Sequence, residues 1–399
     1  MPDAVRAYAG ALPDGRLPAY VHDLPGLRDH VASIAAALPP DVELYYAAKA
    51  NPDAEVLRAV AAHVHGFEVA SGGEYAHVRD AVPGKPVAFG GPGKTPAELA
   101  DAIGSGVHRL HVESEQETYR VAALARATGR TVDVLLRVNP PIELPGGEGA
   151  PLTMGGGPTP FGMDPSVLDR CARLIADEPR VRLRGLHAHL ASGLDADDLG
   201  EVAARLLAWA DAWADRNRTD LREVGVGGGM AVDYRDPAAR FDWAAYGKAL
   251  GGLVRAGGPV LRIEPGRAVA AYHGWYVTDV LDVKHSRGQA FAVVRGGTHH
   301  LRTPVARGHA QPFAVLARDA WPYAWPRPSA SGEPVTVVGQ LCTPKDVLAA
   351  RVPVPGAVRA GDRIVFAMAG AYAWNISHRD FLMHAPPTFH YLAGAGQRT

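Results

Sequence analysis

The sequence predicts an α/β protein in which a closed (β/α)8 barrel is followed by a second, all-β domain. From about residue 43 to 266, eight short β-type runs alternate with helical stretches, and strands that alternate with helices form parallel sheets. Eight such units favour a closed barrel, with an open doubly wound sheet as the alternative on pattern alone. Beyond residue 266, β-type runs follow one another without long helices between them, which indicates the all-β domain.

The eight runs are short, rich in β-branched or aromatic residues, and end in Gly, Asn, Ser or Pro. In chain order they cover residues 43–50, 66–71, 86–91, 109–114, 133–139, 182–191, 223–229 and 261–266. Two of the intervening segments are predicted helices. Residues 53–64 place apolar side chains on one face, and residues 195–216 open with aspartates, which a helix N-terminus favours.

The boundary between the predicted domains falls near residue 266. Residues 26–266 are expected to form the barrel, and residues 267–399 the β domain, which residues 1–25 join because they precede the first barrel strand. One connection is unusually long. Residues 139–162 contain GGEGAPLTMGGGPTP and no periodic pattern, and their position after the fifth strand predicts a substrate or lid loop.

Composition argues against several classes of protein. Lys and Arg number 41 against 42 Asp and Glu, so the basic excess of a nucleic-acid binder is missing. The longest uncharged apolar run, residues 364–374, is too short for a membrane span, which needs about 20 residues. Two cysteines cannot build a disulfide framework, and the first residues lack a signal-peptide pattern. We therefore expect a cytoplasmic enzyme that binds neither nucleic acid nor membrane.

Reactive residues stand where the predicted strands end, and this edge forms the active site of a (β/α)8 barrel. They are Lys49, Glu68, Arg137, His187, His189, Ser192, Gly227–Gly229 and Glu264. A lysine that is partly desolvated after an apolar strand is a good nucleophile. Three glycines allow backbone N–H groups to approach a phosphate, and Arg267, directly after Gly266, could add charge to such a site. A glutamate facing a pyridine nitrogen keeps that nitrogen protonated.

Each of these residues also has a purely structural interpretation. Lys49 and Glu264 could be salt-bridge partners, and the glycine triplet could be a turn. His187 and His189 share one face of a strand, which suits a metal pair, but the sequence offers no clear third ligand. We therefore expect no metal, and one histidine stacked on a planar cofactor.

Eight motifs occur in a fixed order between about residues 43 and 375: YYAAKANP, EVASGGE, LLRVNPP, GLHAHLASG, GVGGGM, EPGR, LCTPKDVL and AGAY. In these motifs the sequence resembles the fold-type III pyridoxal-phosphate decarboxylases, such as the ornithine, arginine and diaminopimelate decarboxylases. The resemblance implies pyridoxal 5'-phosphate (PLP) as cofactor, an alanine racemase-like barrel and decarboxylation of a small amino-acid substrate. Alanine racemases resemble the chain less, because they carry an arginine where Glu264 stands.

The resemblance also implies a role for each matching residue. Lys49 would hold the cofactor aldehyde covalently, His189 would stack on the ring, and Glu264 would pair with the ring nitrogen. The other cofactor contacts would be Glu68, Ser192, Gly227, Gly228, Gly229, Gly266, Arg267 and Tyr372. Cys342 would act in the active site of a partner subunit, which implies a homodimer with active sites at its interface.

Thr343 departs from the resemblance, because relatives that act on basic amino acids or diaminopimelate carry an acidic residue there. A neutral hydroxyl does not offset a buried ammonium, so a free distal amine is not expected. Residues 371–387, AYAWNISHRDFLMHAPP, are similar to the decarboxylases of citrate-derived carboxylate siderophore pathways, such as those of staphyloferrin B and achromobactin. This similarity implies a citryl-diaminopropionate-like substrate. The expected substrate contacts are Arg137, Arg302, Thr343, Asp346 and His378.

Three other functions stay open at this level. The first is decarboxylation of diaminopimelate, ornithine, lysine or arginine. The second is a PLP-dependent racemase or a non-catalytic PLP-binding homologue. The third is a metal-dependent barrel hydrolase that uses His187 and His189.

Overall fold

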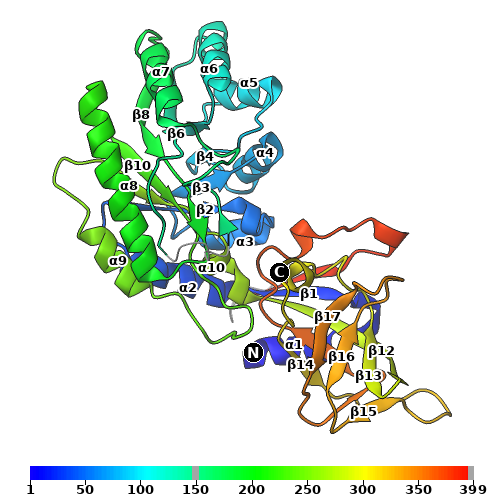
Figure 1. Cartoon of the computed structure of the whole chain (residues 1–399). Helices are drawn as coiled ribbons and strands as arrows, with labels where there is room; N and C mark the ends of the chain where they lie inside the picture. Colours follow the sequence, from blue (N-terminus) through cyan, green and yellow to red (C-terminus); the bar gives the residue numbers. More distant parts are fainter. Residues whose placement is uncertain (146–151, 394–399) are drawn as a thin grey trace. The chain divides into compact units, whose positions relative to one another are not determined.

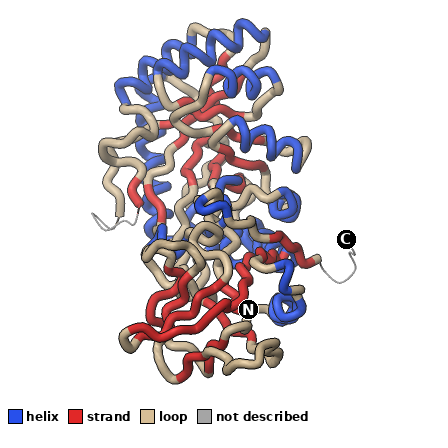
Figure 2. The backbone as a smooth tube through the Cα atoms, turned by 90° about the vertical axis from the view of Figure 1, so that its right-hand side faces the viewer, coloured by secondary structure: helices blue, strands red, loops and turns tan. Residues whose placement is uncertain are grey.

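The computed structural model describes residues 1–145 and 152–393 and divides the chain into two compact units. The barrel unit comprises residues 28–232 and 240–269 (Figure 1). The β unit comprises residues 1–27, 233–239 and the chain from residue 270 onward. Figure 2 shows most of the helices in the barrel unit, whereas the β unit consists chiefly of strands and loops.

Eight parallel strands close the barrel, which confirms the predicted fold and excludes the open sheet. Each strand pairs with the next in chain order, and the last pairs with the first. The strands are β2 (Val42–Ala47), β3 (Gly66–Val69), β4 (Val87–Phe89), β5 (Arg109–Val112), β6 (Val132–Arg137), β8 (Val181–His187), β10 (Glu223–Gly227) and β11 (Val260–Ile263).

Helices follow most of the strands, and several begin where a side chain caps the first turn. Asp53, Ser71, Thr95, Ser114 and Asp195 each accept a hydrogen bond from a backbone N–H that the helix leaves unpaired. The helices are α2 (Leu24–Ala37), α3 (Ala54–Val60), α4 (Gly72–Ala81), α5 (Pro96–Gly104), α6 (Glu115–Thr128), α7 (Pro165–Ala176), α8 (Ala196–Asn217), α9 (Trp243–Gly251) and α10 (Arg267–Ala270). The helix predicted over 53–64 is shorter, because the chain turns after Val60 to enter β3.

Buried ion pairs fill the end of the barrel where the strands begin. The Arg262 guanidinium lies 2.6 Å from a Glu43 carboxylate oxygen and 3.0 Å from one of Glu223, and it sits 4.2 Å above the Tyr45 ring. Arg109 also donates to Glu223. Burial alone would raise the pKa of Glu223, but the hydrogen bond from Arg109 and the charge of Arg262 lower it. We call Glu43, Arg109, Glu223 and Arg262 the floor network.

The β unit contains an eight-stranded sheet, which confirms the predicted all-β second domain. Its strands are β1 (Ala19–Asp23), β12 (Gly274–Ser286), β13 (Gln289–Val294), β14 (Phe313–Leu316), β16 (Val335–Val338), β17 (Val347–Val352), β19 (Arg363–Phe366) and β20 (Thr388–Leu392). β15 (Ser329–Ser331) and β18 (Ala357–Arg359) form a separate pair. Tyr20, Tyr276 and Phe366 meet in the core of the sheet, with ring centroids 5.3 and 6.1 Å apart in the two pairs that Tyr276 makes.

The two ends of the described chain are joined within this unit. β1 runs antiparallel to β12 on one side and parallel to β20 on the other. Arg363 of β19 is buried beneath helix α1 (Asp3–Ala11) and donates to the carbonyl oxygens of Ala9, at 2.5 Å, and Gly10, at 2.8 Å. A cation there satisfies carbonyls that the last turn of a helix leaves unpaired.

Among residues 1–145 and 152–393, no helix combines the length and the apolar composition that crossing a bilayer requires.

Candidate active site

A lysine and a glutamate meet at the barrel end where the strands finish. Lys49 lies in the 3-10 turn Ala48–Ala50, directly after β2, and its Nζ is 2.6 Å from Oε2 of Glu68 on β3. The Lys49 side chain is 43% exposed, whereas that of Glu68 is 6% exposed. A buried carboxylate therefore anchors an amine that a ligand can reach.

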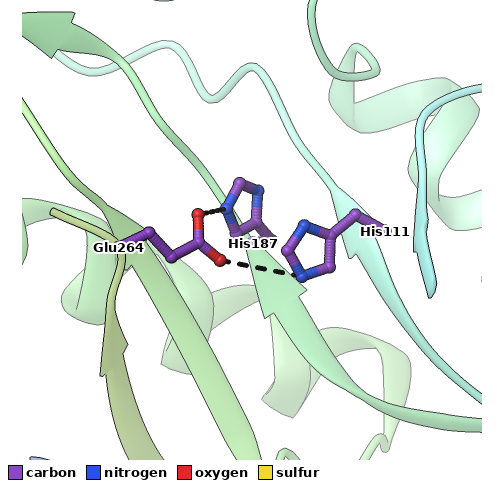
Figure 3. A group of neighbouring side chains, drawn as sticks. All are labelled: His111, His187 and Glu264. Carbon is purple, nitrogen blue, oxygen red and sulfur yellow. Dashed lines mark hydrogen bonds and ion pairs between the residues drawn. The ribbon is translucent and has the colours of Figure 1, made fainter. Parts of the chain in front are cut away.

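Three buried side chains, one on β5, one on β8 and one directly after β11, meet beside this pair (Figure 3). His187 Nε2 lies 2.9 Å from Oε2 of Glu264, and His111 Nε2 lies 3.8 Å from the other oxygen, Oε1. The two imidazoles stack with their centroids 4.1 Å apart and their planes 23° from parallel. We call His111, His187 and Glu264 the imidazole–carboxylate trio. Their ligand atoms all lie within 4.8 Å of one another, so the trio could also hold a metal ion.

The trio keeps Glu264 charged and His111 neutral. Burial acts to raise the pKa of Glu264, but the charge of His187 and its hydrogen bond outweigh burial and lower it. Burial lowers the pKa of His111, and the neighbouring charge of His187 lowers it further. A carboxylate anion is thus held between two imidazoles.

His189 stands two residues beyond the end of β8 as a fixed neutral ring. Burial, with the charges of Lys49 and Arg137, lowers its pKa to about 3. The backbone N–H of Gly228 donates to His189 Nδ1 at 3.2 Å, so the proton of the neutral ring lies on Nε2. Ser192 Oγ is 3.4 Å from this Nε2.

The glycines after β10 and β11 are needed because other groups lie against them. Gly227 has φ +73°, and a Cβ there would lie 2.6 Å from Nδ1 of His189. A Cβ on Gly266 would lie 2.7 Å from the Ala50 Cβ. Arg267 follows Gly266 and begins α10. Bare backbone with a cation beside it has the chemistry of a phosphate site.

Arg137, an expected substrate contact, is buried with its charge already balanced. Its Nη1 donates to Glu113 at 2.8 Å, and its guanidinium lies 5.1 Å above the Phe161 ring. Glu113 also accepts hydrogen bonds from the backbone N–H groups of Gly91, at 2.8 Å, and Gly162, at 3.3 Å. Glu113 therefore joins the ends of β4, β5 and β6.

Sequence reasoning missed His111 and Glu113, which follow Arg109 at alternate positions of one run. Alternate residues of a strand share a face, so this spacing was the available signal that a polar face of the fourth run, residues 109–114, points into the barrel.

The predicted lid loop is described in part, since residues 146–151 lie outside the described residues. Its second half runs along the chain that follows β8. β7 (Leu152–Thr153) pairs antiparallel with β9 (Ala191–Ser192), and the Met154 N–H donates to Leu190 at 2.7 Å. Ser192, the expected phosphate ligand, is therefore paired with the described second half of this loop.

The remaining predicted residues lie in the β unit. Cys342 is exposed and Thr343 is half-buried on the turn between β16 and β17. Asp346 is buried and accepts hydrogen bonds from the backbone N–H groups of Thr298, at 2.6 Å, and Leu341, at 2.8 Å. One oxygen of Asp346 therefore holds the turn that carries Cys342 and Thr343, and the other joins this turn to Thr298.

Arg302 and His378 form a second group in the β unit. Arg302 Nη1 lies 3.1 Å from His378 Nδ1. Burial and the charge of Arg302 lower the pKa of His378, so Arg302 carries the positive charge of this pair. Tyr372 has φ +48°, and its carbonyl oxygen accepts a hydrogen bond from the Thr303 hydroxyl at 2.7 Å.

Comparison with known proteins identifies relatives over nearly the whole chain. Residues 25–271 match the family model described as pyridoxal-dependent decarboxylase, pyridoxal binding domain. The 2-[(L-alanin-3-ylcarbamoyl)methyl]-2-hydroxybutanedioate decarboxylase of Staphylococcus aureus is 40% identical over 94% of this chain and 93% of the relative. An L-glutamyl-[BtrI acyl-carrier protein] decarboxylase of Niallia circulans is 30% identical, over 93% and 87%. A diaminopimelate decarboxylase of Actinosynnema pretiosum is 32% identical, over 93% and 83%.

Solved structures show the same fold. Diaminopimelate decarboxylase from Helicobacter pylori, complexed with L-lysine, superposes with a TM-score of 0.84 at 22% sequence identity, covering 98% of this chain and 94% of that one.

Proposed function

The chain belongs to the family of pyridoxal-dependent decarboxylases, and on that basis we propose that it removes the α-carboxylate of an amino acid whose side chain is joined to citrate through an amide. The family assignment confirms the predicted enzyme class, a carboxy-lyase, and the predicted cofactor, PLP.

The residues at the barrel mouth fit this cofactor. The exposed Lys49 amine can condense with an aldehyde, and bare glycine backbone next to Arg267 suits a phosphate. Oε1 of Glu264 is buried and accepts no hydrogen bond from the described residues, so it can take one from a protonated ring nitrogen. When bound, PLP supplies an electron-withdrawing ring that stabilises the carbanion formed as carbon dioxide leaves.

In this proposal each residue of the candidate site has a defined role. Lys49 would hold the cofactor covalently through its side-chain amine. Glu264 keeps a proton on the ring nitrogen, and the neutral His189 ring packs against the cofactor. The proton that replaces the carboxylate comes from the Lys49 amine or from the Cys342 thiol of a second copy. We propose a cytoplasmic homodimer, and an exposed free thiol at Cys342 suits a reducing compartment.

The substrate proposal depends most on Thr343. Its neutral side chain offers no charge for a free distal amine, and an amide-linked amine needs none. The name of the S. aureus relative describes such a compound, an alanine joined at its third carbon through a carbamoyl group to a hydroxy-dicarboxylic acid. We propose that Arg302, with His378 beside it, binds the distal carboxylates. The product would keep the hydroxyl and carboxylate groups of citrate, as a carboxylate siderophore requires.

The test is carbon dioxide release from citryl-diaminopropionate, diaminopimelate, lysine and ornithine. We expect kcat/KM for the citryl amide to exceed that for each diamine by about 100-fold, since a buried unpaired ammonium costs several kcal/mol. Thr343→Glu should improve turnover of the diamines, whereas the neutral Thr343→Val should keep the original preference. A wild-type preference for diaminopimelate would refute the substrate and support the alternative decarboxylase.

A second prediction concerns the phosphate loop. Gly227→Ala should weaken PLP binding at least about tenfold, because the new Cβ meets the His189 ring and a left-handed alanine costs about 1–2 kcal/mol. Gly257→Ala is the matched control, because Gly257 has φ +74° with open space around it. Both variants should lose similar stability from backbone strain, and an absorbance titration with PLP should separate them. Equal PLP affinity in the two variants would contradict the proposed loop.

A further inference from the structure

Glu264 differs from the other buried glutamates of the barrel in what balances its charge. Glu113 is paired with Arg137, Glu117 with Lys94, and Glu223 with three arginines. Within residues 1–145 and 152–393, the ion-pair partners of Glu264 are imidazoles alone. An arginine keeps its charge in a protein, whereas an imidazole can lose its charge and still donate a hydrogen bond from one nitrogen. Glu264 can therefore accept a second cation without a fixed charge competing for it.

The two oxygens of Glu264 have different surroundings. Oε2 is fixed by His187 Nε2 at 2.9 Å, whereas Oε1 accepts no hydrogen bond from the described part of the chain and has His111 Nε2 at 3.8 Å (Figure 3). One oxygen is held by the protein and the other is left for a donor. The hydrogen bond from His187 therefore fixes the orientation of the Glu264 carboxylate, and no arginine or lysine is paired with it among the described residues.

The His187 ring is held in place on both sides. His111 stacks on it at 4.1 Å, and a Cβ on Gly225 of β10 would lie 2.6 Å from its Cδ2. His111 in turn lies close to Gly90, where a Cβ would be 3.2 Å from Nδ1. Two glycines thus provide the room that two imidazoles occupy inside the barrel.

We propose that His187, supported by His111, is a positioning residue that fixes Oε2 of Glu264 so that Oε1 keeps the cofactor ring nitrogen protonated. This inference depends on the proposed function only in taking Glu264 as the partner of that nitrogen. It assigns a role to two histidines that act through Glu264.

The test compares two amide side chains of different length. The side-chain nitrogen of glutamine can take the place of His187 Nε2, whereas that of asparagine is one methylene too short to reach Glu264. Each variant is loaded with PLP labelled with nitrogen-15 in the ring, and the ring nitrogen resonance reports its protonation without any turnover. We expect His187→Gln to keep the wild-type resonance and His187→Asn to shift it toward the unprotonated form. PLP affinity should fall about tenfold in His187→Asn, the effect of losing one hydrogen bond to a charged group.

Identical resonances and PLP affinities in the two variants would overturn the proposal, whatever their stability. His285→Asn, on an exposed hairpin, serves as the unrelated histidine control and should leave both the resonance and the PLP affinity at their wild-type values. Loss of PLP binding on chelation would also overturn it, by showing that the trio holds a metal ion. A protonated ring in an enzyme that releases no carbon dioxide from any citryl conjugate would leave this inference standing and refute the proposed function.

Discussion

Replacement of Lys49 by alanine is expected to lower kcat by at least about 1,000-fold, because the covalent hold on PLP and a proton-transferring amine are lost together. Borohydride reduction of the wild-type holoenzyme should attach the cofactor to the peptide that contains Lys49, and mass spectrometry should locate it there. The Lys49→Ala protein should carry no such label.

Two further variants distinguish loss of the covalent bond to the cofactor from loss of folding. Lys49→Arg keeps a cation for the Glu68 carboxylate, so we expect a folded protein with a wild-type melting temperature and no covalent label. Lys248→Ala removes an exposed lysine of α9 and should change neither measurement. A cofactor label on any other lysine, or activity retained in Lys49→Arg, would show that Lys49 is not the residue that holds the cofactor.

Replacement of Glu223 by alanine should destabilise the barrel by about 3–5 kcal/mol, because it leaves the buried Arg109 and Arg262 without their shared counter-charge. Urea unfolding followed by tryptophan fluorescence measures the change. Glu201→Ala is the comparison, since its pair with Arg205 lies on the surface and is worth at most about 1 kcal/mol. Equal losses in the two variants would mean that the floor network contributes no more than a surface pair.

The same network predicts how the stability of the barrel depends on pH. The pKa of Glu223 is lowered from its ordinary 4.5 in the folded protein, so the unfolded state binds its proton first as the pH falls. The contribution of Glu223 is therefore complete above about pH 5 and is lost as the pH falls through the folded pKa. Unfolding midpoints of wild type and Glu223→Ala should converge in that range.

The barrel could be predicted because its signal is local. Each of the eight runs is short, apolar and ended by a turn residue, and Asp195 caps the helix that the sequence predicts over 195–216. The position of Lys49 and Glu264 at the barrel mouth could be predicted for a related reason, since a residue that follows a strand lies at that end of a barrel wherever the rest of the chain goes.

The interior of the barrel could not be predicted in this way. His111 meets His187 across the intervening strand β6, and Arg109 meets Glu223 from a strand more than 100 residues away. A lone histidine or arginine in an apolar run gives no sign of a partner so distant. The pairing depends on which strands lie opposite each other, and this is a property of the closed sheet.

The position of β1 between β12 and β20 determines the order in which the protein can be completed during synthesis. β1 emerges from the ribosome early, but its neighbours begin only at Gly274 and Thr388. The whole barrel is translated after β1 and before these neighbours, and it can fold as a unit. During this time both edges of β1 remain unpaired. Such contacts between distant segments form slowly, and an open strand invites pairing with other chains. We therefore expect the β unit to be the last part of the nascent chain to fold and the part that most needs protection by chaperones.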